Sequence, residues 1–206
     1  MGFYDRRVLP WIIDCGCGLE TVTRQRQKVV PRARGRVLEI GAGSGHNLPL
    51  YDHSRVERVW ALEPSLEMRE RAKRNIARAK VAVDWLDLPG EEIPLDDACV
   101  DTVLVTFTLC TIPDHLAALA QMRRVLKPDG QLLFCEHSAA PDESVRRWQD
   151  RLNGLWGKCF GGCNINRRIP EAISASGFNI VQMDSMYLPG TPRIAAWNCW
   201  GEASLA

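Results

Sequence analysis

Apolar and polar residues follow two alternating patterns along the chain. Short runs rich in Val, Leu and aromatic residues are typical of β-strands, and five of them occur at residues 36–40, 58–62, 81–86, 100–106 and 131–136. Two segments between these runs have helical spacing. One covers residues 65–79 and opens at Ser65, a residue type that caps free backbone N–H groups. The other covers residues 116–126 and stops at Lys127-Pro128-Asp129-Gly130, where proline and glycine cannot continue a helix.

The last third of the sequence has a different order of elements. A helical segment over about 167–176 stops at Gly177, and strand-like runs follow at residues 178–187 and 193–200. With no helix between them, these two strands should be antiparallel. Strands that alternate with helices form a mainly parallel sheet covered on both faces. The pattern therefore predicts an α/β fold with a seven-stranded sheet, mainly parallel with an antiparallel last strand, and helices on both faces.

Composition and charge narrow the class of protein. The chain has 206 residues, of which 46% are hydrophobic and 25% charged, as in one ordinary globular domain. Because 26 basic residues face 25 acidic ones, we expect no nucleic-acid partner. The eight cysteines are scattered and do not form a disulfide framework. With no membrane-spanning apolar stretch and no secretory signal at the start, we expect a cytoplasmic protein.

The most informative stretch is a strand that runs into a glycine turn at residues 37–47. Gly41, Gly43 and Gly45 alternate with small residues, and a helix is expected to start directly after them. Glycine permits unusual backbone angles and close approach of a ligand to the main chain, while free N–H groups at a helix start favour a negative group. The turn is therefore a candidate cradle for a nucleotide-like ligand, although many strand-to-helix loops contain such glycines without binding one.

Two acidic residues strengthen this interpretation. Glu39 lies just before the turn, where a carboxylate could attract an ammonium or sulfonium group. Glu63 follows the second strand, at the distance where dinucleotide-binding sheets carry an acid that accepts hydrogen bonds from a ribose. The structural alternative for Glu63 is a carboxylate stabilised by a helix dipole.

Residues 37–45 resemble the first motif of class I S-adenosylmethionine-dependent methyltransferases, and residues 62–65 resemble the ribose-binding strand end of that family. Segments 90–95, 101–106 and 124–132 are similar to its later motifs, in the same order. The resemblance covers roughly residues 35–137. It implies a Rossmann-like fold and S-adenosyl-L-methionine as methyl donor, with S-adenosyl-L-homocysteine as product.

The resemblance also implies site residues. The expected cofactor-binding set is Glu39, Gly41, Ala42, Gly43, Ser44, Gly45, Asn47, Glu63, Pro64, Ser65, Gly90, Glu91, Thr106, Leu109 and Cys110. Within it, the first motif would hold the methionine part, Glu63 the ribose, and Gly90 and Glu91 the adenine.

Segments outside the shared motifs resemble a narrower group, the methyltransferase-like alkyl-thiol S-methyltransferases. They are residues 1–10, 25–31, 135–137 and 160–167. This resemblance implies a small-molecule methyl acceptor, with a thiol favoured. A quinone-like or lipid acceptor methylated on carbon or oxygen is the alternative, and a non-catalytic module that binds S-adenosylmethionine is a further one.

For the acceptor side, the candidate contacts are Thr108, His137, Cys163, Asn164 and Arg167. His137 directly follows the fifth strand and is the candidate catalytic base or positioning group, with a structural histidine as the equal alternative. His46 and His115 are weaker candidates. Cys159 and Cys163 lie four residues apart, but no further Cys or His completes a tetrahedral set, so we expect no metal site.

The whole chain, residues 1–206, is expected to be a single domain. Residues 1–34 would form an N-terminal helical lid, residues 35–137 the cofactor-binding core, and residues 138–206 the acceptor-side segment. The lid carries an apolar face beside basic residues, which also allows weak peripheral contact with an anionic membrane. Because members of the family resembled cover the donor with an N-terminal helix, we favour the lid.

Overall fold

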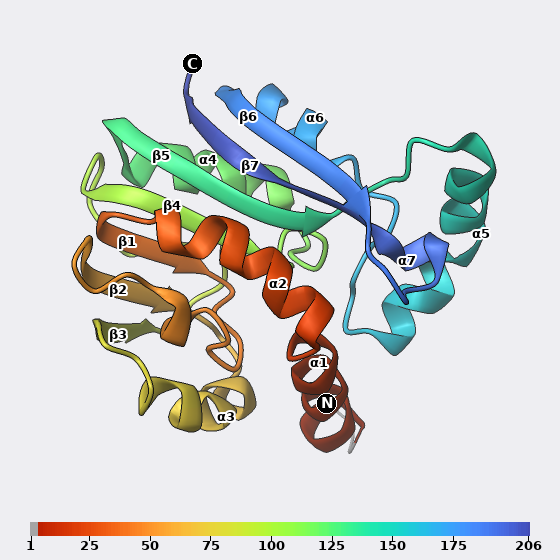
Figure 1. The fold of residues 1–206 in the computed structure, drawn as a ribbon, viewed down its shortest axis with the longest axis horizontal. Coiled ribbons are helices and arrows are strands. Elements are labelled where there is room, and N and C mark those ends of the chain that lie inside the picture. The colour runs from red at the N-terminus through yellow and green to blue at the C-terminus, as the bar shows by residue number, and fades with distance from the viewer. Residues whose placement is uncertain (1–3) are drawn as a thin grey trace.

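A computed structural model describes residues 4–206 (Figure 1). The strands are β1 (Gly35–Ile40), β2 (Val56–Leu62), β3 (Ala82–Leu86), β4 (Val100–Thr106), β5 (Leu126–His137), β6 (Phe178–Tyr187) and β7 (Trp197–Leu205). The α-helices are α1 (Leu9–Cys17), α2 (Glu20–Val29), α3 (Leu66–Ile76), α4 (His115–Val125), α5 (Glu143–Cys159), α6 (Ile169–Ala175) and α7 (Arg193–Ala196). A π-helical turn, Tyr4–Val8, leads into α1, and short 3₁₀ turns form at Val30–Arg32 and Leu48–Leu50.

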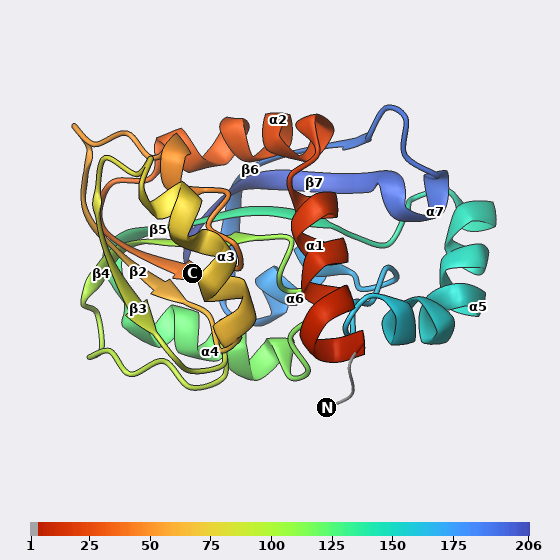
Figure 2. The same ribbon diagram turned by 90° about the horizontal axis from the view of Figure 1, so that it is seen from below.

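All seven strands form one sheet in the order β3-β2-β1-β4-β5-β7-β6. Strands β1 to β5 pair in parallel, whereas β7 is antiparallel to both of its neighbours. The sheet is therefore mainly parallel with one antiparallel strand, the last in the sequence, as predicted. Helix α2 covers one face, and α4 and α6 cover the other (Figure 2).

Alternating side chains of the central strands fill a core on each side of the sheet. Leu38 packs on the face that α4 and α6 cover, with Met122 and Ile173 among its cluster. The neighbouring Val37 packs on the opposite face, in a cluster with Val29 and Val30 at the end of α2. Because both faces are covered, the central strands are apolar without interruption, which explains why the sequence showed continuous runs rather than strict alternation.

Most predicted elements are confirmed, with differences at their ends. Strands β4 and β6 have the predicted bounds, and Ser65 caps α3 by accepting a hydrogen bond from the Met68 N–H at 3.3 Å. Helix α4 ends before Pro128 as predicted, but residues 126–130 already belong to β5.

The predicted strand at residues 193–200 is wrong in its first half. Residues 193–196 form the helical turn α7, and the strand begins only at Trp197. Pro192 sets the start of this turn, and the Leu188 N–H donates to the Ala196 carbonyl across it, so the chain turns back before it enters the sheet.

Close packing of β7 against β6 generates a stability prediction. A Cβ on Gly201 would lie 2.1 Å from the backbone oxygen of Gln182, whereas a Cβ on Gly154, exposed in the middle of α5, would meet nothing within 4 Å. We expect Gly201→Ala to lower the free energy of unfolding by about 1–3 kcal/mol, because the two strands must separate. Gly154→Ala should raise it by about 0.5–1 kcal/mol, since alanine favours a helix. Urea denaturation of both variants measures the two changes, and equal values would contradict the packing argument.

Candidate functional site

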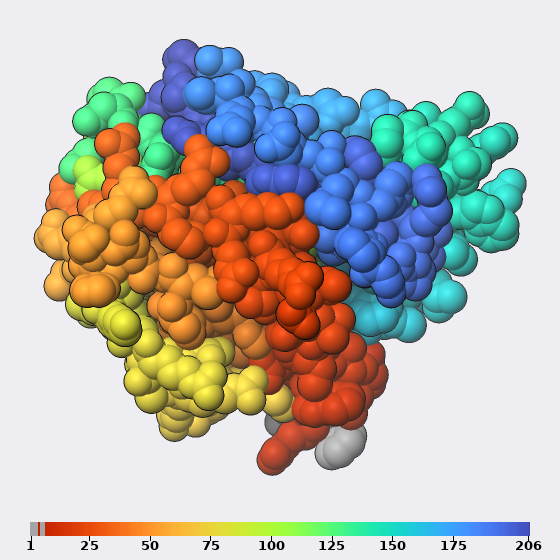
Figure 3. Space-filling view, viewed as in Figure 1, coloured from red at the N-terminus to blue at the C-terminus, as the bar shows by residue number. Residues whose placement is uncertain are grey.

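A cavity of about 660 Å³ opens at the carboxyl ends of β1, β2 and β4. Its wall combines α1 and Arg26 of α2 with the glycine turn, residues 63–68, residues 106–108, Thr111 and Gly161. Figure 3 shows the two N-terminal helices, in red and orange, between the α3 side of the molecule and the C-terminal segment. Segments from both ends of the chain therefore meet over the edge of the sheet where ligands of such folds bind.

The glycine turn has the backbone that glycine alone adopts easily. Gly41, Gly43 and Gly45 have φ values of 64°, 56° and 74°. A Cβ on Gly41 would also lie 2.3 Å from Cγ2 of Thr108. Both the conformation and the close approach of the neighbouring loop thus require a residue without a side chain at this position.

The helix expected directly after the turn is absent, and this expectation is wrong. Leu48–Leu50 form a single 3₁₀ turn, and the backbone is extended again at Tyr51. There the hydroxyl of Tyr51 reaches back and donates to Glu39 Oε2 at 2.7 Å. The N–H groups available to a ligand at this point therefore belong to the turn itself, while the first regular helix start after the turn is that of α3.

Glu39 is buried behind the turn and is not part of the cavity wall. Besides Tyr51, its carboxylate accepts a hydrogen bond from Asn47 Nδ2 at 2.9 Å. Burial raises the pKa of Glu39, against the opposing effect of these two hydrogen bonds. Glu39 thus contacts Asn47 and Tyr51, and its direct contact with a cationic ligand stays a prediction.

Arg26 is a site residue that the sequence analysis missed. It is 5% exposed, lines the cavity, and donates from Nη1 to Asn47 Oδ1 at 3.0 Å and to Thr106 Oγ1 at 2.5 Å. Its guanidinium lies 5.1 Å from the centre of the Phe107 ring. Within a polar helix, an arginine is ordinarily a solvent-facing residue, so only its place in the segment 25–31 that resembled the narrower family marked it.

Glu63, which the sequence predicts to bind a ribose, lines the cavity. Its two carboxylate oxygens accept hydrogen bonds from the backbone N–H groups of Gly43 and Ser65, both at 2.9 Å. Burial raises the pKa of Glu63 above its usual value. The predicted neighbours Ala42, Ser44, Pro64 and Ser65 also line the cavity. Glu63 therefore joins the glycine turn to the start of α3.

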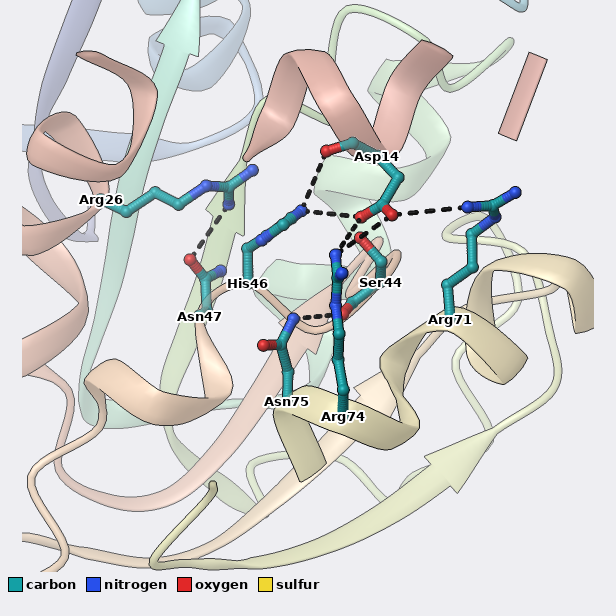
Figure 4. Close-up of polar contacts among 8 residues, drawn as sticks. All are labelled: Asp14, Arg26, Ser44, His46, Asn47, Arg71, Arg74 and Asn75. Carbon is teal, nitrogen blue, oxygen red and sulfur yellow. Dashed lines mark hydrogen bonds and ion pairs between the residues drawn. The ribbon is translucent and has the colours of Figure 1, made fainter. Parts of the chain in front are cut away.

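A cluster of charged residues holds α1 over the glycine turn (Figure 4). The carboxylate of Asp14 in α1 lies 3.0 Å from Nε2 of His46, 3.5 Å from Arg71 and 3.3 Å from Arg74 of α3. Burial pushes the pKa of Asp14 upward, but the nearby Ser44 hydroxyl, His46 and the two arginines outweigh it and lower the pKa. Burial, together with Arg26, lowers the pKa of His46, so its imidazole is neutral near pH 7.

Helix α1 has one side toward the cavity and one toward solvent. Leu9 and Ile13 line the cavity, whereas Trp11 is 56% exposed. The lid and the membrane contact stay predictions. The predicted N-terminal lid also includes residues 1–3, which lie outside the residues that the structure describes. Among residues 4–206, no helix has the length and apolar character needed to cross a membrane.

Seven predicted cofactor contacts lie outside the cavity wall: Glu39, Gly45, Asn47, Gly90, Glu91, Leu109 and Cys110. Gly90 is packed so closely that a Cβ would lie 3.0 Å from Ile112 Cδ1. The Glu91 carboxylate accepts a hydrogen bond from the Asp114 N–H at 3.2 Å. Gly90 and Glu91 therefore contact the loop before α4 and do not line the space beside Glu63.

On the acceptor side, Thr108 lines the cavity, but the other four predicted residues do not. Asn164 donates to the Cys110 carbonyl at 3.1 Å, and Arg167 donates to the carbonyls of Leu109 at 2.5 Å and Ile112 at 2.6 Å. Both side chains thus fasten the loop 107–112 to the segment after α5. Contact of these two side chains with an acceptor stays a prediction; in this structure their amide and guanidinium groups donate to backbone carbonyls.

His137 lies against Cys163, with Nε2 and Sγ 3.3 Å apart. Burial lowers the pKa of His137, but Cys163 and Glu136 outweigh it and raise the pKa. Cys110 completes a group of three with these residues, whereas Cys159 is exposed and apart from it. The sequence analysis considered only the spacing of Cys159 and Cys163, whereas these three residues come from separate parts of the chain.

Comparison with known proteins agrees with this geometry. The family model described as "Methyltransferase domain" matches residues 38–134. Human (Homo sapiens) thiol S-methyltransferase TMT1B is 31% identical over 173 residues, which cover 79% of this chain and 70% of the human protein. The demethylmenaquinone methyltransferase of Clavibacter sepedonicus is 32% identical over 122 residues, which cover 59% of this chain and 49% of that protein.

A solved structure shares the fold. The crystal structure of a SAM-dependent methyltransferase from Aquifex aeolicus superposes with a TM-score of 0.65 at 17% identity, covering 96% of this chain and 98% of that one. Family model, relatives and fold agree with the motif order read from the sequence. The chain belongs to the class I S-adenosylmethionine-dependent methyltransferases.

Proposed function

We propose that this methyltransferase transfers the methyl group of S-adenosyl-L-methionine to a small thiol. The choice of a thiol as acceptor rests on the extent of the match. Similarity to the thiol S-methyltransferase covers 79% of the chain, whereas similarity to the demethylmenaquinone methyltransferase covers 59%. The longer match takes in segments outside the shared core. Because the donor motifs lie within residues 35–137, similarity beyond them is the part of the match that bears on the acceptor.

The cavity fits the donor in size and in the chemistry of its wall. Its volume lies within the range of small-molecule sites, roughly 300–1,000 Å³. Glu63 would accept hydrogen bonds from the ribose hydroxyls, since a carboxylate oxygen can accept more than one. Arg26 would pair with the carboxylate of the methionine part, because its buried Nε has no polar partner among the residues described. When bound, the donor supplies a methyl group on a positively charged sulfur.

The protein must also position the donor and the acceptor and allow the acceptor to lose its proton. The acceptor thiol must lose its proton, because the thiolate is the nucleophile, and the products are a methyl thioether and S-adenosyl-L-homocysteine. Leu9 and Ile13 would exclude water above the reacting atoms, and Thr108 lies in the floor of the cavity. Holding the two reactants in line supplies much of the rate.

Two histidines are candidates for accepting that proton. His137 was the first choice from the sequence, but it lies outside the cavity wall and contacts Cys163. His46 lines the cavity, and Asp14 orients its Nε2. A neutral imidazole held by a carboxylate is a common arrangement for a general base. We therefore favour His46 for this role.

Removal of the Glu63 carboxylate should weaken donor binding. We expect Glu63→Ala to reduce the affinity for S-adenosyl-L-methionine by about 1–3 kcal/mol through loss of charge-assisted hydrogen bonds. Glu70→Ala is the matched control, since Glu70 is exposed on α3 and does not line this cavity. Isothermal titration calorimetry on both variants measures the affinities. Unchanged binding by Glu63→Ala would remove its proposed role.

Neutralising Asp14 should loosen α1. Because the fold depresses the pKa of Asp14, its charge stabilises the structure above its unfolded pKa, about 3.9, and the contribution is lost as pH falls through the folded pKa. At pH 7 we expect Asp14→Asn to speed amide hydrogen exchange in α1 by about tenfold, or roughly 1.4 kcal/mol of local stability.

The control for this measurement is Glu20→Gln, which removes the exposed ion pair with Arg24 and should leave exchange in α1 unchanged. The difference between Asp14→Asn and the unaltered protein should shrink as the pH is lowered below about 4. Equal exchange at pH 7 would show that Asp14 does not hold the helix.

A panel of acceptors tests the reaction itself. The protein is incubated with S-adenosyl-L-methionine labelled in the methyl group and with hydrogen sulfide, an alkyl thiol, a quinol or a lipid amine in turn. We expect labelled thioether or methanethiol from the thiols, and a rate reduced in Glu63→Ala at limiting donor. Label only in the quinol or lipid amine would replace the thiol by that acceptor. Donor binding without transfer to any acceptor would indicate a binding module.

A further inference from the structure

Two cysteine sulfurs and one imidazole nitrogen, each from a separate segment, lie close together outside the cavity wall. Cys110 lies in the loop after β4, His137 ends β5, and Cys163 follows α5. Their Sγ atoms and a ring nitrogen of His137 all lie within 4.8 Å of one another. Cys110 and Cys163 are 2% and 7% exposed. None of the three lines the cavity assigned to the donor, so they form a separate group.

We propose that Cys110, His137 and Cys163 bind one thiophilic divalent cation, with Zn²⁺ as the ion best suited to them. Two thiolates and a neutral imidazole are a preferred ligand set for Zn²⁺. Their two negative charges balance the dication, so the buried site carries no net charge. Three protein ligands leave the fourth tetrahedral position to a non-protein ligand such as water.

The distance between the ligand atoms of His137 and Cys163 is close to that in a tetrahedral zinc site. Bond lengths of about 2.3 Å to sulfur and 2.0 Å to nitrogen place the two ligand atoms about 3.5 Å apart in a tetrahedron. Nε2 of His137 and Sγ of Cys163 are 3.3 Å apart. The other two pairs of ligand atoms lie within 4.8 Å, so they need to approach by about 1.3 Å at most to surround an ion.

Surrounding hydrogen bonds hold the ligands in place. Trp156 Nε1 lies 3.4 Å from Sγ of Cys163 and donates to it, as N–H groups around metal thiolates do. The Asn164 N–H donates to the Cys110 carbonyl at 2.9 Å, which fixes the two cysteine-bearing segments side by side. Arg167 binds two further carbonyls of the same loop. The contacts of Asn164 and Arg167 thus prearrange the group without using the ligand atoms, and Trp156 adds a hydrogen bond to one of them.

An ion here would join two segments that line the cavity. Thr108 and Thr111 of the first segment and Gly161 of the second are in the cavity wall. Binding would therefore stiffen the wall without contact with the donor, and the proposal does not depend on the identity of the acceptor.

Metal binding is tested on the full chain, reduced and stripped of metal with a chelator. Titration with Co²⁺ should give one equivalent bound, with the absorption of a thiolate-to-cobalt charge transfer, and Zn²⁺ should displace it. Cys163→Ser and Cys110→Ser should each weaken binding by at least about 100-fold, and His137→Gln should weaken it as well. Cys159→Ser is the matched control, since Cys159 is an exposed cysteine four residues from Cys163, and should leave binding unchanged.

A second measurement needs no variant. Zn²⁺ should protect Cys110 and Cys163 from alkylation, identified by peptide mass spectrometry, while the exposed Cys15 and Cys159 react with or without the metal. The proposal is overturned if Co²⁺ gives no charge-transfer band in the unaltered protein. It is also overturned if the alkylation of Cys110 and Cys163 is the same with and without Zn²⁺.

Discussion

A buried chain of hydrogen bonds from Arg26 through Asn47 to Glu39 connects the parts that make the site. It joins helix α2 to the glycine turn and, through Thr106, to the end of β4. A buried guanidinium and a buried carboxylate are costly to leave without partners, so each fixes the position of the other groups. The network therefore ties the glycine turn, through Asn47, to α2 and to the end of β4.

The donor side of the molecule could be largely predicted, because local rules determine it. Alternation of strands and helices indicated the sheet, and glycines with positive φ together with Glu63 marked the cavity. The error after the turn has a tertiary cause: the bond from Tyr51 to Glu39 draws the chain back to an extended conformation. Arg26 was overlooked for a similar reason, since nothing in a polar helix shows which arginine is buried.

The acceptor side could not be predicted in the same way. Asn164 and Arg167 have the chemistry of ligand contacts, yet loop carbonyls with no regular partner take up their hydrogen bonds. No short sequence spacing indicates the group of Cys110, His137 and Cys163, because they are 27 and 26 positions apart. Such groups follow from how loops meet in space, and the identity of a residue alone does not distinguish a side chain that binds substrate from one that secures the wall around it.

The two N-terminal helices are attached with unequal strength. Helix α2 is secured by the buried Arg26 and packs against β5 and β7. Helix α1 is held by the ion pairs of Asp14 with Arg71 and Arg74 of α3, two arginines that are partly exposed. The junction between them includes Gly18, which ends α1. If the contacts of Asp14 were lost, α1 would therefore separate from α3 more easily than α2 from the sheet. Because α1 also lines the cavity, this would widen the cavity and leave the hydrogen bonds of Arg26 in place.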